Sequence, residues 1–111
     1  MITTCVLKSK IHRIKITHTD ISSDGGLVVD GSFMTAASMI ENEKVHVVNV
    51  NNGERFVTYI RKALAGSGIC NLHGADARRG EPGDIIIIIS YAKMEMNGAK
   101  NYRPHIIFPT Q

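Results

Sequence analysis

Residues 44–61, KVHVVNVNNGERFVTYIR, carry the clearest structural signal in the chain. Apolar and polar side chains largely alternate along residues 44–50, which is typical of a half-buried β-strand. The link Asn-Asn-Gly at 51–53 separates this run from a second strand-like run, residues 54–61. Asn-Gly between two such runs predicts a β-hairpin, because both residues tolerate the positive φ angles of a type I′ turn.

Three further stretches are predicted to be strands. In residues 11–17, Ile14 and Ile16 fall on one face and polar side chains on the other, the period of two of a half-buried strand. Residues 27–29 form a short apolar run. Residues 83–92, GDIIIIISYA, hold five consecutive isoleucines. That run is too short to span a bilayer, which needs about 20 apolar residues, and it predicts a strand buried on both faces.

A short helix is predicted over residues 32–40. Asp30 or Ser32 can cap its start, because a short polar side chain can accept a hydrogen bond from the first free N–H groups. Four small or apolar side chains fall at helical spacing: Phe33, Ala36, Ala37 and Ile40. The predicted fold class is therefore mainly β with one or two short helices, and closure into a small barrel would remove the free strand edges.

Length and composition set the limits for any function. With 111 residues the chain is expected to be a single domain, 1–111, that buries a core without disulfides or a metal. The net charge of +3 is not gathered into a basic run, so nucleic-acid binding is permitted but not indicated. The first residues lack the pattern of a secretory signal, so we expect a cytoplasmic protein with no membrane partner. Cys5 and Cys70 are far apart and are expected to be reduced thiols.

Motifs for common chemistries are sparse. The five histidines show neither HxxxH nor HxH spacing, so no metal site is predicted: they are His12, His18, His46, His73 and His105. No GxGxxG or P-loop pattern is present to hold a nucleotide. Ser22 and Ser23 adjoin Asp24, and we interpret them as turn residues in preference to nucleophiles.

Three segments resemble, in register, signature segments of the pyruvoyl-dependent aspartate 1-decarboxylases. They are KSKIHRIKITHTD at 8–20, NVNNGERFVTY at 49–59 and GDIIIIISYA at 83–92. The similarity runs through residues 1–95, and the tail from Met94 onward matches weakly. The resemblance implies a double-psi β-barrel, a homotetramer, and conversion of L-aspartate to β-alanine for pantothenate synthesis.

The resemblance also implies a self-processed precursor. Members of that family cut themselves at a Gly-Ser bond, and the new N-terminal residue becomes a pyruvoyl group. Its ketone forms a Schiff base with the substrate amine and serves as the electron sink when carbon dioxide leaves. In this chain the bond falls between Gly25 and Gly26, which would give chains 1–25 and 26–111. Whether maturation needs a separate protein factor stays open.

The resemblance assigns roles to two pairs of residues. Lys10 and Arg55 match basic residues that hold the substrate carboxylates, a task suited to fixed positive charge. Thr58 matches the residue that assists self-cleavage, and Tyr59 the proposed proton donor. Strict alternation puts Arg55 and Tyr59 on one strand face and Thr58 on the other, so one common site requires a bulge or a neighbouring subunit.

Three positions depart from the family pattern. Segment His73, Gly74 and Ala75 matches a substrate-contacting Asn-Gly-Ala, with histidine in place of asparagine. Ser23 stands where an aromatic residue is usual, and Gly26 stands where the family has its serine. Glycine can neither attack the Gly25 carbonyl nor become a pyruvoyl group.

Three explanations of Gly26 stay open at this point. The glycine is a substitution that traps the precursor, the mark of a member that has lost catalysis, or a processed residue written as glycine. The alternative function is therefore an uncleaved barrel that binds an acidic metabolite or a protein partner.

Overall fold

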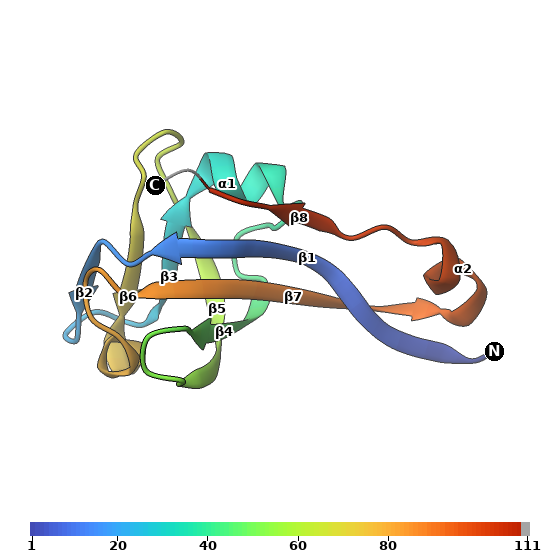
Figure 1. The fold of residues 1–111 in the computed structure, drawn as a ribbon, viewed down its shortest axis with the longest axis horizontal. Coiled ribbons are helices and arrows are strands. Elements are labelled where there is room, and N and C mark those ends of the chain that lie inside the picture. Colours follow the sequence, from blue (N-terminus) through green and yellow to red (C-terminus); the bar gives the residue numbers. More distant parts are fainter. Residues whose placement is uncertain (110–111) are drawn as a thin grey trace.

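Eight strands form one continuous sheet in the computed structural model, which describes residues 1–109 (Figure 1). The strands are β1 Thr3–Lys15, β2 His18–Asp20, β3 Gly26–Asp30, β4 Lys44–Asn49, β5 Arg55–Ala63, β6 Cys70–His73, β7 Ile85–Glu95 and β8 His105–Ile107. Their order across the sheet is β2-β6-β3-β5-β4-β7-β1-β8. The short helices are α1 Gly31–Ala36, the 3₁₀ helix η1 Gly74–Arg79 and α2 Met96–Asn101. The prediction of a mainly β domain is confirmed, and residues 1–109 contain three short helices where one or two were predicted.

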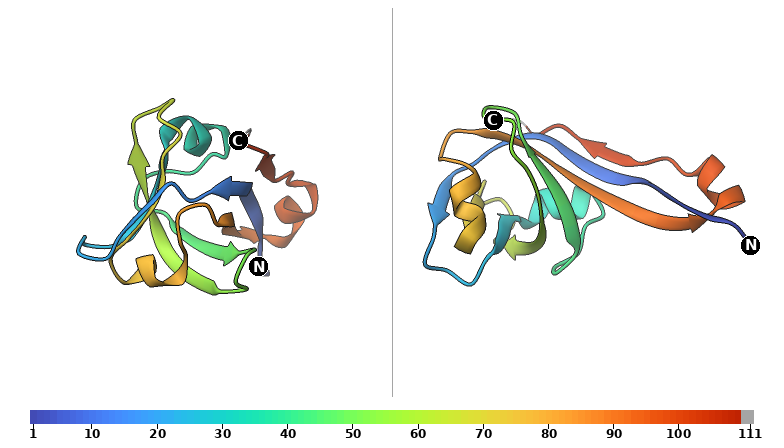
Figure 2. Two further views of the ribbon diagram at one scale, coloured as in Figure 1. Left: turned by 60° about the vertical axis from the view of Figure 1, so that its left-hand side comes forward. Right: turned by 90° about the horizontal axis from the view of Figure 1, so that it is seen from below.

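The sheet curls on itself, as the two views in Figure 2 show, and encloses one mainly aliphatic core. Just beyond β1, Thr17 donates from its N–H to the Cys70 carbonyl at the start of β6, at 2.8 Å. This bond joins the β1 end of the sheet to its β6 region, as expected of a small barrel. The long β1–β7 ribbon continues past the barrel toward the N-terminus and α2 (Figure 1). The completely buried side chains include Ile11, Ile14, Leu27, Val29, Ile60, Leu72, Ile86 and Ile88.

Strands β4 and β5 pair antiparallel and form the predicted hairpin, but its turn is of another type. Of the loop residues, only Gly53 has a positive φ, +77°. The type I′ turn was therefore the wrong prediction. The Asn49 side-chain oxygen accepts from the Asn51 N–H at 2.9 Å, and the Asn49 N–H donates to the Glu54 carbonyl at 2.8 Å. The side chain of Asn49 thus organises a longer loop than the Asn-Gly pair predicts.

Residues 11–16 keep the predicted faces, although the register of β1 with β7 shifts at two places. Ile14 and Ile16 are buried and Arg13 is exposed, as the alternation predicts. The register with β7 shifts between His12 and Ile14, where Arg13 adopts a φ of +70°. This extra residue is a β-bulge, and it lets Ile11 and Ile14 both face the core although they are three positions apart.

The isoleucine run lies on β7 between β1 and β4. Ile86 and Ile88 are completely buried, whereas Ile85, Ile87 and Ile89 are half-buried. The predicted strand is confirmed, but full burial on both faces is wrong. One face packs into the core, and within residues 1–109 the other face is only partly covered.

Helix α1 is shorter than the predicted 32–40. The Asp30 side chain caps its start, as expected, by accepting from the Ser32 N–H. The chain leaves the helix after Ala36, and Ser38 then adopts a left-handed φ of +55°. Ile40 consequently does not join the helical apolar face and is 71% exposed.

Asp30 anchors the end of β3. Only 2% of the residue is exposed. Its carboxylate accepts from the Ser32 N–H at 2.8 Å and hydroxyl at 2.7 Å, from the Gly66 N–H at 2.9 Å and from the Gly68 N–H at 2.8 Å. Burial disfavours the charged carboxylate, but these hydrogen bonds outweigh burial and lower the pKa of Asp30 to about 2.

Asp30→Asn is expected to lower the free energy of unfolding at pH 7 by about 2 kcal/mol. Because the folded pKa lies below the unfolded one, the carboxylate stabilises the fold above the unfolded value and loses that effect as pH falls toward 2. Urea unfolding of the parent between about pH 5 and pH 2 should show this decline, and the variant should show a flatter profile. Asp24→Asn, at an exposed carboxylate, is the control. Parallel pH profiles for parent and Asp30→Asn would contradict the assignment.

Candidate functional site

Gly25 and Gly26 lie where the loop after β2 enters β3. Their φ angles are +119° and +93°, in the left-handed region that favours glycine. Gly26 pairs with His73 across the antiparallel β3–β6 ladder. On the other side β3 pairs in parallel with β5, beginning with Leu27 opposite Ile60. The glycine pair is therefore set between two strands that both supply residues to the site.

Tyr59 of β5 faces this glycine pair. A β-carbon built on Gly26 would lie 3.1 Å from Cε2 and from Cζ of the Tyr59 ring. A β-carbon built on Gly25 would lie 3.7 Å from the Tyr59 hydroxyl oxygen. The structure thus brings the expected proton donor and the expected cleavage position together within one chain.

Arg61 also reaches the glycine pair, and sequence reasoning missed it. Its Nη1 donates to the Gly25 carbonyl oxygen at 3.1 Å. Its Cδ lies only 2.8 Å from the β-carbon position of Gly26. Arg61 comes two residues after Tyr59 on the same strand, so the alternation that places Tyr59 in the site could have identified it.

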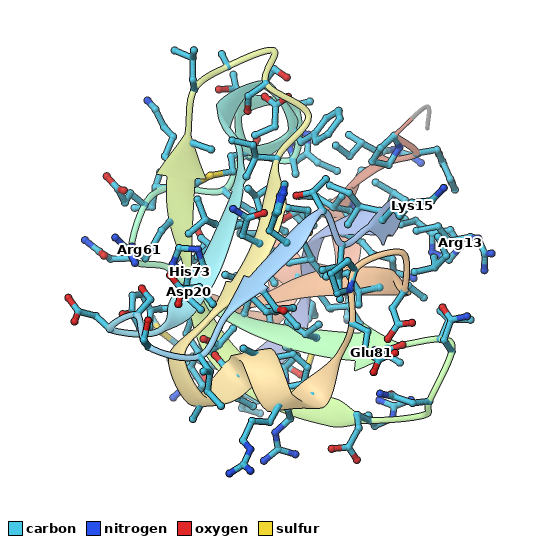
Figure 3. All side chains as sticks on the ribbon, turned by 90° about the vertical axis from the view of Figure 1, so that its left-hand side faces the viewer. Arg13, Lys15, Asp20, Arg61, His73 and Glu81 are labelled. Carbon is cyan, nitrogen blue, oxygen red and sulfur yellow. The ribbon has the colours of Figure 1, made fainter. Side chains whose placement is uncertain are left out.

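His73 and the loop that precedes Gly25 complete this end of the molecule, where Figure 3 shows Asp20, His73 and Arg61 together. His73 Nδ1 and the Ser23 hydroxyl oxygen share a hydrogen bond of 2.9 Å. Asp20 lies opposite His73 in the β2–β6 ladder and accepts from the Ser22 hydroxyl at 2.7 Å and N–H at 3.1 Å. These two bonds lower the pKa of Asp20, and the charge of His73 lowers it further.

Gly74 packs directly against the loop. It has a φ of +69°, and a β-carbon built on it would lie 2.7 Å from Gly25 Cα, 2.9 Å from Gly25 N and 3.0 Å from the Ser23 carbonyl oxygen. No side chain fits there without moving the backbone. Ala75 follows at the start of η1 and is exposed.

The Thr58 side chain is on the opposite face of β5 from Tyr59. β5 pairs with β4 residue by residue from Arg55 to Tyr59, so the side chains alternate without a bulge. Tyr59 and Arg55 are exposed on the outer face, whereas Phe56 and Ile60 are buried on the face shared with Thr58. The predicted division of these residues between two faces is confirmed.

Lys10 lies on β1, and Arg55 lies at the start of β5, four residues before Tyr59. Lys10 is half-buried on β1, and strands β7, β4 and β5 separate β1 from β3. Arg55 is exposed at the start of β5, beside a shallow pocket of about 150 Å³ that His46 and Val57 also line. Within residues 1–109 no hydrogen bond or ion pair joins either cation to Gly26 or Tyr59.

The comparison with known proteins identifies the family. The model of the aspartate decarboxylase family matches residues 1–111. The chain belongs to this family. The aspartate 1-decarboxylase of Parabacteroides distasonis is 50% identical over 104 residues, which cover 94% of this chain and 90% of the relative. Those of Cytophaga hutchinsonii and Phocaeicola vulgatus are 48% and 49% identical over the same shares.

In this member of the aspartate decarboxylase family, the three residues that depart from the expected pattern lie together. Ser23 is hydrogen-bonded to His73, and His73 is paired by its backbone with Gly26. This hydrogen bond joins the two side chains that stand where the sequence resemblance predicts an aromatic residue and an asparagine. The three departing residues are thus connected to one another by hydrogen bonding and strand pairing.

Other features outside the glycine cluster do not extend the site. A pocket of about 420 Å³ is lined mostly by polar residues from positions 51–52 and 78–84 and does not include the glycine pair. Across residues 1–109, no group of three or more His, Cys, Asp or Glu side chains is arranged to hold a metal ion. The described part of the chain contains no helix long and apolar enough to cross a membrane.

Gly74→Ala is expected to destabilise the fold by about 3 kcal/mol, because the new methyl group clashes with backbone atoms of Gly25 and Ser23. Gly53→Ala is the matched control, since Gly53 has a similar φ of +77° but open space around it. The control should cost about 1 kcal/mol, the backbone strain alone. Urea unfolding measures both, and equal losses would show that Gly74 is not packed against the loop.

Proposed function

We propose that this chain carries the function of the aspartate 1-decarboxylases, the decarboxylation of L-aspartate to β-alanine and carbon dioxide for pantothenate synthesis in the cytoplasm. Position 26 is the proposed reacting position, and Gly25–Gly26 is the proposed cleavage bond between chains 1–25 and 26–111. The full-length family match supports this proposal.

The structural observation that carries the proposal is the approach of Tyr59 to position 26. The phenol ring lies 3.1 Å from the β-carbon position of residue 26, and the hydroxyl oxygen lies 3.7 Å from that of residue 25. A tyrosine hydroxyl in this place is suited to proton transfer at a group held by residue 26. Thr58, one position earlier, is the proposed residue for assisting cleavage.

Substrate binding is proposed to use more than one subunit. L-aspartate carries two carboxylates, and Arg55 and Lys10 are the proposed cations that hold them. Because Lys10 lies on β1 and Arg55 lies four residues before Tyr59 at the start of β5, we propose that a homotetramer completes the site from neighbouring subunits. Exposed apolar side chains beside Arg55 and on the β1–β7 ribbon support self-association: Val57 is 50% exposed and Tyr91 is 45% exposed. His73, Gly74 and Ala75 are the proposed remaining contacts.

The implied pyruvoyl group does not fit the chain with glycine at position 26. A pyruvoyl group needs a β-carbon, and glycine has none. A β-carbon at this position would also meet Arg61 Cδ at 2.8 Å. The proposed decarboxylation therefore depends on what occupies position 26, and the residues around it supply binding and proton transfer only.

The packing around Gly26 favours a second function for the chain as written. In this function the barrel stays uncleaved and binds an acidic metabolite or a protein partner through its basic side chains. Arg61 donates a hydrogen bond to the Gly25 carbonyl, and Ser23 is hydrogen-bonded to His73. These two hydrogen bonds fix the conformation of the loop. This arrangement requires no side chain at position 26.

Denaturing intact-mass measurement before and after a carbonyl-trapping reagent separates the two functions. A fragment that ends at Gly25, with a larger fragment that gains the mass of the reagent, supports the decarboxylase. A single uncut 12.2 kDa species that ignores the reagent supports the uncleaved barrel. Release of carbon dioxide from L-aspartate is then measured on the same sample. A cut, reagent-reactive protein that releases none would contradict the proposed reaction.

Arg55→Ala is expected to weaken L-aspartate binding about tenfold or more, because a charge-assisted carboxylate contact contributes about 1.5–3 kcal/mol. Isothermal titration calorimetry measures this binding directly, and no turnover is needed. Arg103→Ala removes an exposed arginine elsewhere and should leave the affinity unchanged. Equal affinity of Arg55→Ala and the parent would remove Arg55 from the substrate site.

A further inference from the structure

Arg61 fills the space over Gly26. Its Cδ lies 2.8 Å from where a β-carbon on residue 26 would stand, closer than carbon atoms approach in folded proteins. Two ring atoms of Tyr59 lie 3.1 Å from the same point. Gly26 is itself buried, so solvent offers no alternative direction for a new side chain. A side chain at position 26 and Arg61 in its present rotamer therefore exclude each other.

Arg61 is also held in this place. Its Nη1 donates to the Gly25 carbonyl oxygen at 3.1 Å, so swinging the side chain away breaks a charge-assisted hydrogen bond. Its backbone is fixed opposite Val28 in the parallel β3–β5 pair. The clash cannot be relieved by moving one strand, because the β3–β5 ladder would be broken.

The loop at residues 23–25, on the other side of Gly26, is also fixed in position. Ser23 is hydrogen-bonded to His73 at 2.9 Å. Gly74 packs so closely against Gly25 that even one added carbon would lie 2.7 Å from the Gly25 Cα. Position 26 is thus enclosed by Arg61, Tyr59 and a tightly packed loop.

We infer that Arg61 is a positioning residue that closes position 26 to any side chain and holds the Gly25 carbonyl within an intact loop. Restoring serine at position 26 alone is then insufficient for reaction at the 25–26 bond. Arg61 must also be shortened. The inference concerns the covalent state of the chain and is independent of whether the protein binds L-aspartate.

The reaction that tests this is an N-to-O acyl shift in a Gly26→Ser chain. The hydroxyl oxygen of the introduced serine bonds to the Gly25 carbonyl carbon, the C–N bond of the 25–26 peptide breaks, and the hydroxyl proton ends on the freed nitrogen. No atom is gained or lost. Added neutral hydroxylamine attacks the resulting ester, releasing residues 1–25 as a hydroxamate and leaving residues 26–111 with a free serine hydroxyl and amine.

The experiment compares the parent, Gly26→Ser, Arg61→Ala and the double variant by denaturing intact mass in hydroxylamine. The double variant should be cleaved at least tenfold faster than Gly26→Ser, and the two proteins with Gly26 should stay whole. Arg61→Val serves as a second shortened variant if the alanine protein is poorly folded, since valine also lacks a Cδ and suits a strand.

Thermal unfolding of the same proteins tests the steric exclusion without any chemistry. Gly26→Ser should lower Tm by about 10 °C in the parent and by less than half as much with Arg61→Ala, because the clash is then absent. Gly53→Ser, at a φ of +77° with open space, controls for backbone strain. Additive losses of Tm, or equal cleavage of Gly26→Ser with and without Arg61, would overturn the inference. If no variant is cleaved, the Tm coupling alone decides it.

Discussion

Strand β3 is paired along both edges, parallel to β5 and antiparallel to β6, and this double pairing controls the whole candidate site. It sets Gly26 opposite His73 on one side and beside the Tyr59 and Arg61 side chains on the other. At the far end of the strand, the buried Asp30 carboxylate accepts hydrogen bonds from Ser32 and from the loop before β6. A strand held at both edges and at one end cannot shift to accommodate a changed side chain, because backbone hydrogen bonds would be lost.

The site is built on backbone conformations that favour glycine. Gly25, Gly26 and Gly74 all have positive φ angles and meet at one point. Glycine adopts such conformations readily because it has no β-carbon, and here the two ladders and the close packing of Gly74 fix them in place. The aliphatic core and the satisfied carboxylate of Asp30 stabilise the remainder of the fold.

The cations proposed to hold the substrate carboxylates are different from the residues that surround position 26. The cations suited to carboxylates are Lys10 on β1 and Arg55 at the start of β5, whereas the groups around position 26 are Tyr59, Arg61 and His73. A change at position 26 can therefore alter the covalent chemistry while leaving the basic side chains in place. For this reason membership of the aspartate decarboxylase family and possession of its reactive group are different questions for this chain.

The sequence by itself determined the elements whose signals are local. Alternation predicted the last part of β1 and strands β4 and β5, and the Asn-Gly pair predicted the hairpin. The choice of Asp30 or Ser32 as a cap predicted the start of α1. Each of these signals depends on neighbours within a few residues. The resemblance to the family also singled out Gly26 as a predicted departure from the expected serine. The sequence did not predict the bulge at Arg13, the early end of α1 or the loop organised by Asn49, since these depend on how the chain packs.

Only the tertiary structure decided what surrounds position 26. Arg61 is far from Gly26 in sequence, and the parallel pairing of β3 with β5 alone brings its Cδ into the space of the absent side chain. The contact of Ser23 with His73 likewise depends on β6 lying between β2 and β3. Alternation can state which face a side chain occupies, but non-local strand pairing determines what that face meets.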